Sequence, residues 1–209
     1  TSSIMNKKLL ILSPNHLPAV IDFAEAHGFN CETQTTHHWK SHFKAHAKKQ
    51  AAILANPGAL HEAKIQSTLI INGPNLNLLG VREPEIYGTD TLAEITNRCI
   101  SIASTSKCTL DFRQSNHEGE IVTWIQGSPN SDAIVINAGA YTHTSIAIQD
   151  ALKSYPGLVV ELHISNPHQR EHFRHHSFIT PTADAAAIGL GTKGYDLLIE
   201  LICSEANAA

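Results

Sequence analysis

From residue 67 onward, short apolar runs alternate with stretches whose apolar residues recur at helical spacing. The runs have the length of strands and are almost continuously apolar, which is typical of strands covered on both faces. We expect a last helix within 185–203 and five strands, at 68–72, 108–112, 132–137, 157–164 and 177–180. Regular alternation of strands and helices predicts an α/β fold with a parallel sheet between two layers of helices.

The first 66 residues carry a shorter version of the same pattern. Residues 8–12 resemble a strand, residues 17–27 a helix, and residues 37–55 a longer helical pattern. The sequence Asn56-Pro-Gly58 contains strong turn formers, which end the helix and open a short connector. We therefore expect an N-terminal extension that is either α/β or mostly helical.

The charge distribution divides the chain at the same place. Residues 1–66 have 7 lysines and 4 acidic residues, a net charge of +3. Residues 67–209 have 3 lysines, 5 arginines and 15 acidic residues, a net charge of −7. This change predicts two units, an extension of unknown role at 1–66 and a second domain at 67–209. A charge of +3 is too small for a nucleic-acid-binding arm, so we expect no nucleic acid partner.

The composition favours a cytoplasmic protein with no membrane partner. The apolar content of 42% is too high for a disordered chain, and runs such as Leu9–Leu12 and Ala133–Ile136 are too short to cross a membrane. The first residues lack the apolar core of a signal peptide. The four cysteines are far apart in the sequence and form no CxxC pair, so neither a disulfide framework nor a zinc ribbon is expected.

Polar residues cluster where the expected strands end. Ligands of parallel α/β sheets bind outside the carboxyl ends of the strands. Four polar clusters fall at such ends, at 72–87, 114–120, 137–143 and 163–174. This coincidence predicts a binding site at that edge of the sheet.

Two strand ends supply candidate site residues. Asn137 and His143 flank a glycine-containing turn, where they either cap the turn or bind a ligand. Glu161 and His163 alternate with apolar residues on the next strand, so both point to the same side of the sheet. His163 is either a hydrogen-bonded core residue or part of a site.

Two further segments add charged candidates. Arg170 and Arg174 are four residues apart, on one face of a short helix expected at 170–176. They are either solvated or a clamp that binds a carboxylate through forked hydrogen bonds. The loop that follows the first strand lacks the glycine-rich phosphate-binding patterns and has the character of a mobile lid. It carries Arg82 and Tyr87, and a cation beside a phenol favours the phenolate.

Several long motifs in this half of the chain occur together and in order. They are 72–88 (NGPNLNLLGVREPEIYG), 114–120 (QSNHEGE), 137–145 (NAGAYTHTS), 161–166 (ELHISN) and 170–177 (REHFRHHS). Through these motifs, residues 68–203 closely resemble the type II 3-dehydroquinate dehydratases, also called 3-dehydroquinases. The resemblance does not include residues 1–66.

The resemblance implies a fold, an assembly and an activity. The family has a flavodoxin-like three-layer sandwich with a five-stranded parallel sheet, and it forms trimers that pack into dodecamers. It needs neither a metal nor a cofactor. Its members remove water from 3-dehydroquinate by anti elimination through an enolate, and the product is 3-dehydroshikimate. The same hydro-lyase reaction serves the shikimate pathway, which leads to aromatic amino acids, and quinate catabolism, and the sequence does not distinguish them.

The resemblance also implies catalytic roles. Tyr87 matches the base that removes the proton next to the ketone, and Arg82 the cation that holds it as phenolate. Asn75 matches the residue that positions a water against the enolate oxygen. His163 matches the acid that protonates the departing hydroxyl, with Glu161 as its orienting partner.

Binding residues follow from the same motifs. The substrate hydroxyls and carboxylate are expected to contact the side chains of Asn137, His143 and Arg174 and the backbone amides of Ile164 and Ser165. Asp150 matches a position that reaches the site of a neighbouring subunit. The residue types suit the chemistry, since a tuned phenolate is a stronger base than a carboxylate and histidine donates protons near neutrality.

The same residues leave three alternatives. A catalytically inactive flavodoxin-like binding or scaffold protein is disfavoured, because every motif residue needed for catalysis is present. A lysine imine mechanism is disfavoured, because Lys107, Lys153 and Lys193 all lie outside the motifs. In the extension, His38, His42 and His46 share one helix face and form either a metal site or, far more commonly, a solvated surface.

Overall fold

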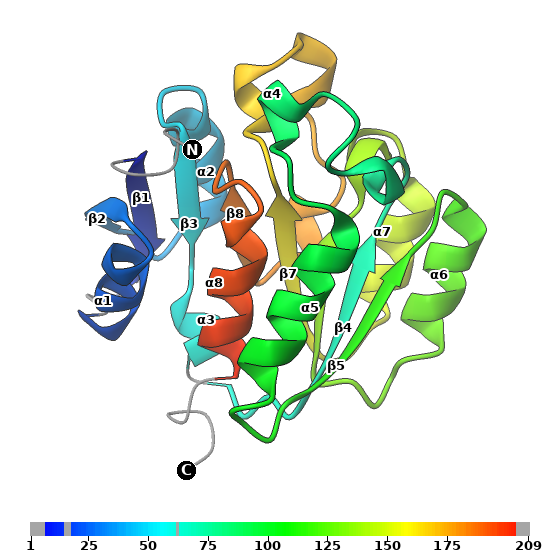
Figure 1. Cartoon of the computed structure of the whole chain (residues 1–209). Helices are drawn as coiled ribbons and strands as arrows, with labels where there is room; N and C mark the ends of the chain where they lie inside the picture. The colour runs from blue at the N-terminus through cyan, green and yellow to red at the C-terminus, as the bar shows by residue number, and fades with distance from the viewer. Residues whose placement is uncertain (1–6, 15–17, 62, 204–209) are drawn as a thin grey trace.

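The computed structural model describes residues 7–14, 18–61 and 63–203, and its strands form one sheet (Figure 1). The strands are β1 (Lys7–Ser13), β2 (Phe29–Thr35), β3 (Ala52–Ala55), β4 (Ser67–Asn72), β5 (Thr109–Gln114), β6 (Ala133–Asn137), β7 (Leu158–His163) and β8 (Ala185–Ile188). Their order is β2-β1-β3-β8-β7-β6-β4-β5. Neighbouring strands are parallel except β3 and β8, which are antiparallel.

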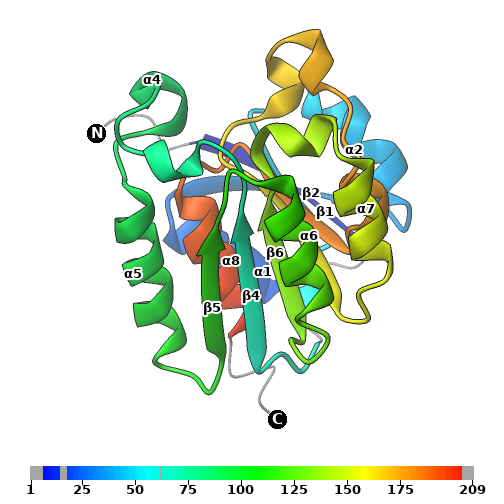
Figure 2. The same cartoon turned by 90° about the vertical axis from the view of Figure 1, so that its right-hand side faces the viewer.

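Helices cover both faces of this sheet. They are α1 (Pro18–Ala26), α2 (Trp39–Ala47), α3 (Gly58–His61), α4 (Pro84–Tyr87), α5 (Leu92–Ala103), α6 (Glu118–Gln126), α7 (Ile146–Lys153) and α8 (Lys193–Ile202). Helices α1, α3, α5 and α8 pack on one face, and α2, α6 and α7 on the other (Figures 1 and 2). The three layers confirm the expected flavodoxin-like sandwich.

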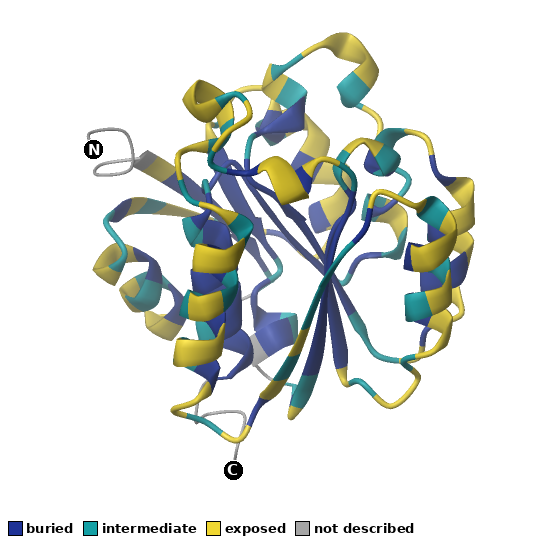
Figure 3. Ribbon diagram, turned by 45° about the vertical axis from the view of Figure 1, so that its right-hand side comes forward, coloured by how far each residue is buried: buried dark blue, intermediate teal, exposed yellow. Residues whose placement is uncertain are grey.

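The strands explain why the apolar runs are continuous rather than alternating. Leu9 and Ile11 of β1 belong to the core under α1 and α8, whereas Leu10 and Leu12 belong to the core under α2. All four side chains are buried. Figure 3 shows the same trend for the sheet as a whole, whose inner strands are coloured as buried. Because both faces of the strand are covered, successive residues must all be apolar.

The first 66 residues extend the sheet, so it has eight strands rather than five. Strands β1, β2 and β3 form a parallel set, and β3 joins β8 through Ile53–Ile188, Leu54–Ala187 and Ala55–Ala186. The prediction of one helical pattern over 37–55 was wrong at its end, where β3 forms, and the second strand of the extension was missed. A short Ala-Ile-Leu-Ala run suits either structure, and its pairing with two neighbouring strands decides the outcome.

Two expectations near the carboxyl end of the chain were also wrong. The last strand is β8, and residues 177–180 lead instead into a 3-10 turn at Thr180–Thr182. The hydroxyls of this segment bind Glu161, and the alanine-rich β8 has a weak strand signal of its own. The helix expected at 170–176 is replaced by separate 3-10 turns at Pro167–Gln169 and His172–Arg174.

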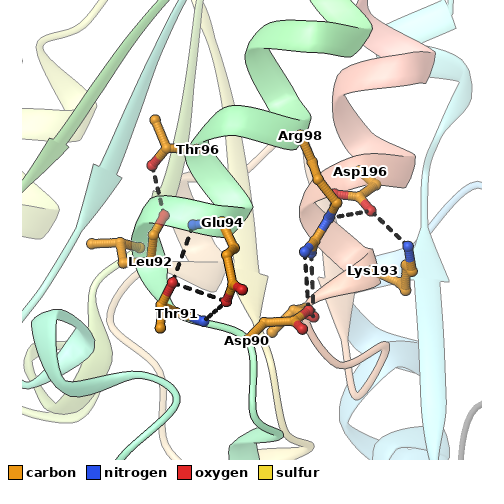
Figure 4. A network of polar contacts seen from close by, with 9 residues as sticks. Asp90, Thr91, Leu92, Glu94, Thr96, Arg98, Lys193 and Asp196 are labelled. Carbon is orange, nitrogen blue, oxygen red and sulfur yellow. Dashed lines mark hydrogen bonds and ion pairs between the residues drawn. The ribbon is translucent and has the colours of Figure 1, made fainter. Parts of the chain in front are cut away.

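Helix α5 begins with a complete capping box. The Thr91 hydroxyl accepts a hydrogen bond from the Glu94 amide at 3.2 Å, and the Glu94 carboxylate accepts one from the Thr91 amide at 2.7 Å (Figure 4). Both amides would otherwise lack partners at the helix start. Among the described residues, no helix has the length and apolar character needed to cross a membrane.

Candidate active site

One pocket opens at the carboxyl ends of β4, β6 and β7 and gathers most of the residues expected from the sequence. Its lining includes Asn75, Arg82, Tyr87, Asn137, His143, His163, Ile164, Ser165 and Arg174. Glu161 lies directly behind His163, and Asp150 lies elsewhere, on the exposed side of α7. The site residues therefore converge from segments that are about one hundred positions apart in the chain.

The loops after β4 and β6 meet through backbone contacts. The Gly73 amide donates to the Asn137 carbonyl at 2.8 Å. A side chain at Gly73 would place its Cβ 2.2 Å from the Ala138 carbonyl oxygen, closer than any real contact. Gly139 has φ +58° and packs against Pro74. Glycine at 73 thus permits the approach that brings Asn75 beside Asn137 and His143.

A buried chain of hydrogen bonds sets the orientation of Asn137. The Tyr195 hydroxyl donates to Oδ1 of Asn72 at 2.6 Å and accepts from Nδ2 of Asn137 at 3.0 Å. Burial raises the pKa of Tyr195, so its hydroxyl keeps its proton. Tyr195 was not among the site residues expected from the sequence. A buried tyrosine needs a partner for its hydroxyl, and this need was the signal available in the sequence.

Glu161 and His163 form a buried pair at the base of the pocket. Nε2 of His163 lies 2.8 Å from Oε1 of Glu161, and Ser177 and Thr180 donate their hydroxyls to the same carboxylate. Burial alone would raise the pKa of Glu161, but the hydrogen bonds from His163, Thr180 and Ser177 hold it below its ordinary value. An ionised carboxylate can only accept a hydrogen bond, so Nε2 of His163 carries a proton. Nδ1 is then left to exchange a proton with a bound molecule.

His143 stands beside this pair as a neutral ring. Its Nδ1 donates to the His176 carbonyl at 2.7 Å, and its ring stacks on that of His163 with centroids 6.4 Å apart. Burial lowers the pKa of His143 more than the bond to His176 raises it. A neutral His143 with its proton on Nδ1 offers Nε2 as an acceptor for a substrate hydroxyl.

Tyr87 lies between two arginines at the mouth of the pocket. Nη1 of Arg170 donates to the Tyr87 hydroxyl oxygen at 2.7 Å, with its guanidinium carbon 5.5 Å from the ring centroid. The guanidinium of Arg82 lies 5.9 Å from the same ring and pairs with Glu83 at 3.0 Å. The family resemblance implied Arg82 as the cation for Tyr87, and Arg170 was expected only in a carboxylate clamp. Tyr87 and Arg170 are 83 positions apart, so nothing in the sequence indicated this contact.

Two more residues that line the pocket lie on the same segment as Arg170. Ser165 follows β7, and its hydroxyl lies 3.5 Å from Nη1 of Arg170. Arg174 pairs with Glu171 at 2.9 Å and lines the pocket on the same side. Guanidinium groups beside backbone amides at a strand end form a favourable environment for a carboxylate.

Two networks secure the lid loop (residues 75–88). At its start, Oδ1 of Asn116 accepts from the Asn75 amide at 2.9 Å, and the Tyr141 hydroxyl donates to the Asn116 carbonyl at 2.7 Å. Asn75 itself has φ +68°, a left-handed conformation that asparagine tolerates. The lid therefore starts from a braced turn.

Just beyond the other end of the lid, Arg98 joins two carboxylates from different parts of the chain (Figure 4). Its guanidinium lies 3.1 Å from Asp90 and 3.1 Å from the nearly buried Asp196 of α8. Thr192 adds a hydrogen bond to Asp90 at 2.5 Å, and Lys193 lies 3.2 Å from Asp196. Because Asp90 follows Tyr87 and Gly88 closely, this network ties the lid to α5 and α8. This network was not among the features expected from the sequence.

Two candidate residues or groups lie outside the pocket. Asp150 is exposed and lies 3.3 Å from Lys153 on the same helix. In the extension, the rings of His42 and His46 stack with centroids 6.4 Å apart. Across the described ranges, no three or more His, Cys, Asp or Glu side chains are grouped so that they could hold a metal ion.

Comparison with known proteins decides the family. The family model described as Dehydroquinase class II matches residues 66–203. The chain belongs to this family. A class II dehydroquinase domain thus accounts for the sheet from β4 to β8 and for the whole pocket.

Similar proteins match between about two thirds and three quarters of this chain. A 3-dehydroquinate dehydratase of Streptomyces coelicolor is 54% identical over 154 residues, which are 73% of this chain and 96% of that protein. The 3-dehydroquinate dehydratase 2 of Pseudomonas aeruginosa is 48% identical over 69% of this chain and 98% of its own. The crystal structure of a type II dehydroquinase from Butyrivibrio crossotus has a TM-score of 0.65 and 42% identity, and it covers 68% of this chain and 100% of its own.

Proposed function

We propose that this chain is an active 3-dehydroquinate dehydratase, a hydro-lyase that converts 3-dehydroquinate to 3-dehydroshikimate. One observation carries the proposal: a phenol and an imidazole line the same pocket, each with a partner of the charge it needs. Arg170 bonds to the Tyr87 oxygen, and Glu161 bonds to the His163 ring. A base and an acid held in one pocket suit the anti elimination of water.

Tyr87 is the base in this mechanism. Removal of the proton next to the ketone leaves an enolate, and the phenolate form of Tyr87 accepts that proton. The hydrogen bond from Arg170 stabilises negative charge on the phenol oxygen, and Arg82 adds a second cation on the lid. Asn75, at the start of the lid, positions a water that hydrogen-bonds to the enolate oxygen.

His163 is the acid. In the second step, the electrons of the enolate form the new double bond while the hydroxyl leaves with a proton from Nδ1 of His163. The buried carboxylate of Glu161 holds the ring by its other nitrogen, so it orients His163 and balances the charge of the imidazolium. No group other than the side chains and a water is needed for these steps.

The substrate carboxylate and hydroxyls have partners around the pocket. The carboxylate binds to the backbone amides of Ile164 and Ser165, with Arg174 as a nearby cation. Neutral His143 accepts a hydrogen bond from one hydroxyl, and Asn137 contacts another. All five arginines of the chain lie in residues 67–209, so cations are available for the anionic substrate although this domain has a negative net charge.

We also propose that residues 67–209 form the catalytic domain and that copies of the chain assemble as trimers packed into a dodecamer. Asp150 is exposed on α7, as a residue that reaches a neighbouring subunit must be. The four cysteines are free thiols, which supports a cytoplasmic location. The mass in solution, measured by light scattering, tests the assembly; a monomer would contradict it.

The deciding experiment follows the absorbance of the conjugated enone when the protein is mixed with 3-dehydroquinate. Wild type is expected to produce the signal, and Tyr87→Phe is expected to lose it while keeping its fold and substrate binding. Arg113→Lys is a control, because Arg113 pairs with Asp111 outside the pocket. No signal from wild type, or full activity in Tyr87→Phe, would contradict the proposal.

A further inference from the structure

The N-terminal extension contacts the segment that carries part of the proposed site. Asn166 is buried at the end of β7, where its side chain faces α2 of the extension. Its Nδ2 donates to the carbonyls of Ala47 and Gln50, both at 2.7 Å. Its Oδ1 accepts from the His168 amide at 3.0 Å. One side chain therefore joins the carboxyl end of α2 to the turn that follows Ser165.

One of these bonds satisfies a group that a helix leaves open. The last carbonyls of any helix have no amide partner within the helix. The Asn166 amide supplies a partner to the carbonyl of Ala47, the last residue of α2. A buried carbonyl without a partner is costly, so the contact favours one fixed position of the turn against the helix.

Further contacts follow the same segment along α2. Nε2 of Gln169 donates to the Gln50 carbonyl at 3.1 Å, and the Phe43 ring meets the His168 ring edge-on with centroids 6.1 Å apart. Lys40 donates to the Pro181 carbonyl at 2.8 Å. Figure 2 shows α2 beside this segment, on the face of the sheet opposite α1 and α8.

The segment itself has little regular structure to hold it. Between β7 and β8 it forms only single 3-10 turns. It nevertheless includes Ser165 and Arg174 of the pocket and Arg170, whose guanidinium bonds to Tyr87. Asn166 is adjacent to Ser165 in the chain, and Gln169 is adjacent to Arg170. A shift of the turn against α2 would therefore move the partner of Tyr87.

We propose that the extension is a positioning element for catalysis, in which α2, through Asn166, holds the turn that places Arg170 on Tyr87. The inference rests on the proposed function for its kinetic consequence, but the coupling between α2 and the turn stands by itself. It assigns a role to a part of the chain that lies outside residues 66–203, which match the class II dehydroquinase family.

A matched pair of substitutions in the extension tests the proposal. Phe43→Ala removes a buried ring that contacts His168, and Phe29→Ala removes an equally buried ring from the core on the other face of the sheet. Hydrogen exchange of the 165–174 segment is expected to quicken in Phe43→Ala only. Its kcat for 3-dehydroquinate is expected to fall about tenfold or more, since a displacement of about 1 Å can cost up to about 100-fold. Phe43→Leu is expected to restore most of the slow hydrogen exchange and most of kcat.

A substitution on the other side of the contact is almost isosteric. Asn166→Asp keeps the oxygen that accepts from the His168 amide but removes the N–H donors to the carbonyls of Ala47 and Gln50. It is expected to quicken exchange of the same segment and to lower kcat more than it raises KM, because Arg170 acts on the base. Gln169→Ala, which removes one exposed donor, is expected to have a smaller effect in the same direction.

The outcomes separate this inference from the proposed function. Unchanged exchange and unchanged kcat in both Phe43→Ala and Asn166→Asp would overturn it. Equal effects of Phe43→Ala and Phe29→Ala would also overturn it, because they would show general destabilisation. If wild type does not convert 3-dehydroquinate, the proposed function fails, and the exchange measurements still decide whether α2 holds the turn.

Discussion

Arg170 donates a hydrogen bond to the hydroxyl oxygen of Tyr87, across the mouth of the pocket and across 83 positions of sequence. Arg82 is only five residues from Tyr87, yet its guanidinium lies over the ring and pairs with Glu83. A donor on the oxygen stabilises a phenolate more directly than a cation over the ring face. The two arginines therefore differ in what they do for the base.

Arg170→Met is expected to lower kcat more severely than Arg82→Met. It removes the donor on the Tyr87 oxygen, and loss of base activation typically costs about 10²-fold or more in rate. Steady-state kinetics with 3-dehydroquinate check the comparison, with Arg113→Met as the control outside the pocket. Equal effects of the two pocket variants would argue against a special role for Arg170.

Glu161→Gln is expected to lower both stability and kcat. An uncharged amide cannot accept all three hydrogen bonds, and loss of one partner of a buried charged pair costs about 3 kcal/mol. The pKa of Glu161 is held below 4.5, so its contribution to the free energy of unfolding is complete above that pH and is lost as the pH falls through the lower folded value.

Urea unfolding at a series of pH values checks this prediction. The difference in free energy of unfolding between wild type and Glu161→Gln is expected to be constant near neutrality and to shrink in acid. Glu32→Gln is the control, because Glu32 is exposed and pairs with Lys8 away from the pocket. A difference that stays constant down to the lowest pH would show that Glu161 is not the group involved.

Arg98→Ala is expected to loosen the lid from the rest of the domain. It leaves Asp196, which is nearly buried, without its guanidinium partner, and the expected loss of stability is about 1–3 kcal/mol. Because Asp90 is also released, kcat/KM is expected to fall as well. Arg113→Ala removes an exposed pair and is expected to change stability by less than about 1 kcal/mol. A lid that remains equally protected from proteolysis in Arg98→Ala would contradict the anchoring role.

His168→Leu is expected to make the protein less sensitive to mild acid. Burial, with the nearby His175 charge, lowers the pKa of His168 to about 4. Between these two pH values His168 binds a proton in the unfolded chain but not in the folded protein. The free energy of unfolding of wild type therefore falls as the pH drops from 6.5 toward 4. The leucine variant lacks this loss, which thermal unfolding between pH 7 and pH 4 measures. A parallel decline in both proteins would exclude His168 as the cause.

The sequence predicted the site better than it predicted the extension. Tyr87, Asn137, His143 and His163 were found because polar residues gather at strand ends and because long motifs recur in a known family. β3 was missed because four apolar residues suit a helix or a strand equally well until neighbouring strands are present to pair with them.

Contacts between distant segments could not be predicted from the sequence either. Neither Asn166 nor Tyr195 was among the candidate site residues expected from the sequence. Their partners, Ala47 and Asn72, are 119 and 123 positions away. Hydrogen-bond partners at such distances follow from topology, which local patterns do not encode.

The sequence by itself determined the α/β class, the parallel sheet of the second domain and the residues of the candidate site, because periodicity and motifs are local properties. The tertiary structure decided that β3 pairs antiparallel with β8, that Arg170 rather than Arg82 bonds to the Tyr87 oxygen, and that α2 meets the turn at Asn166. These outcomes depend on which buried groups can satisfy one another only after the whole chain has folded.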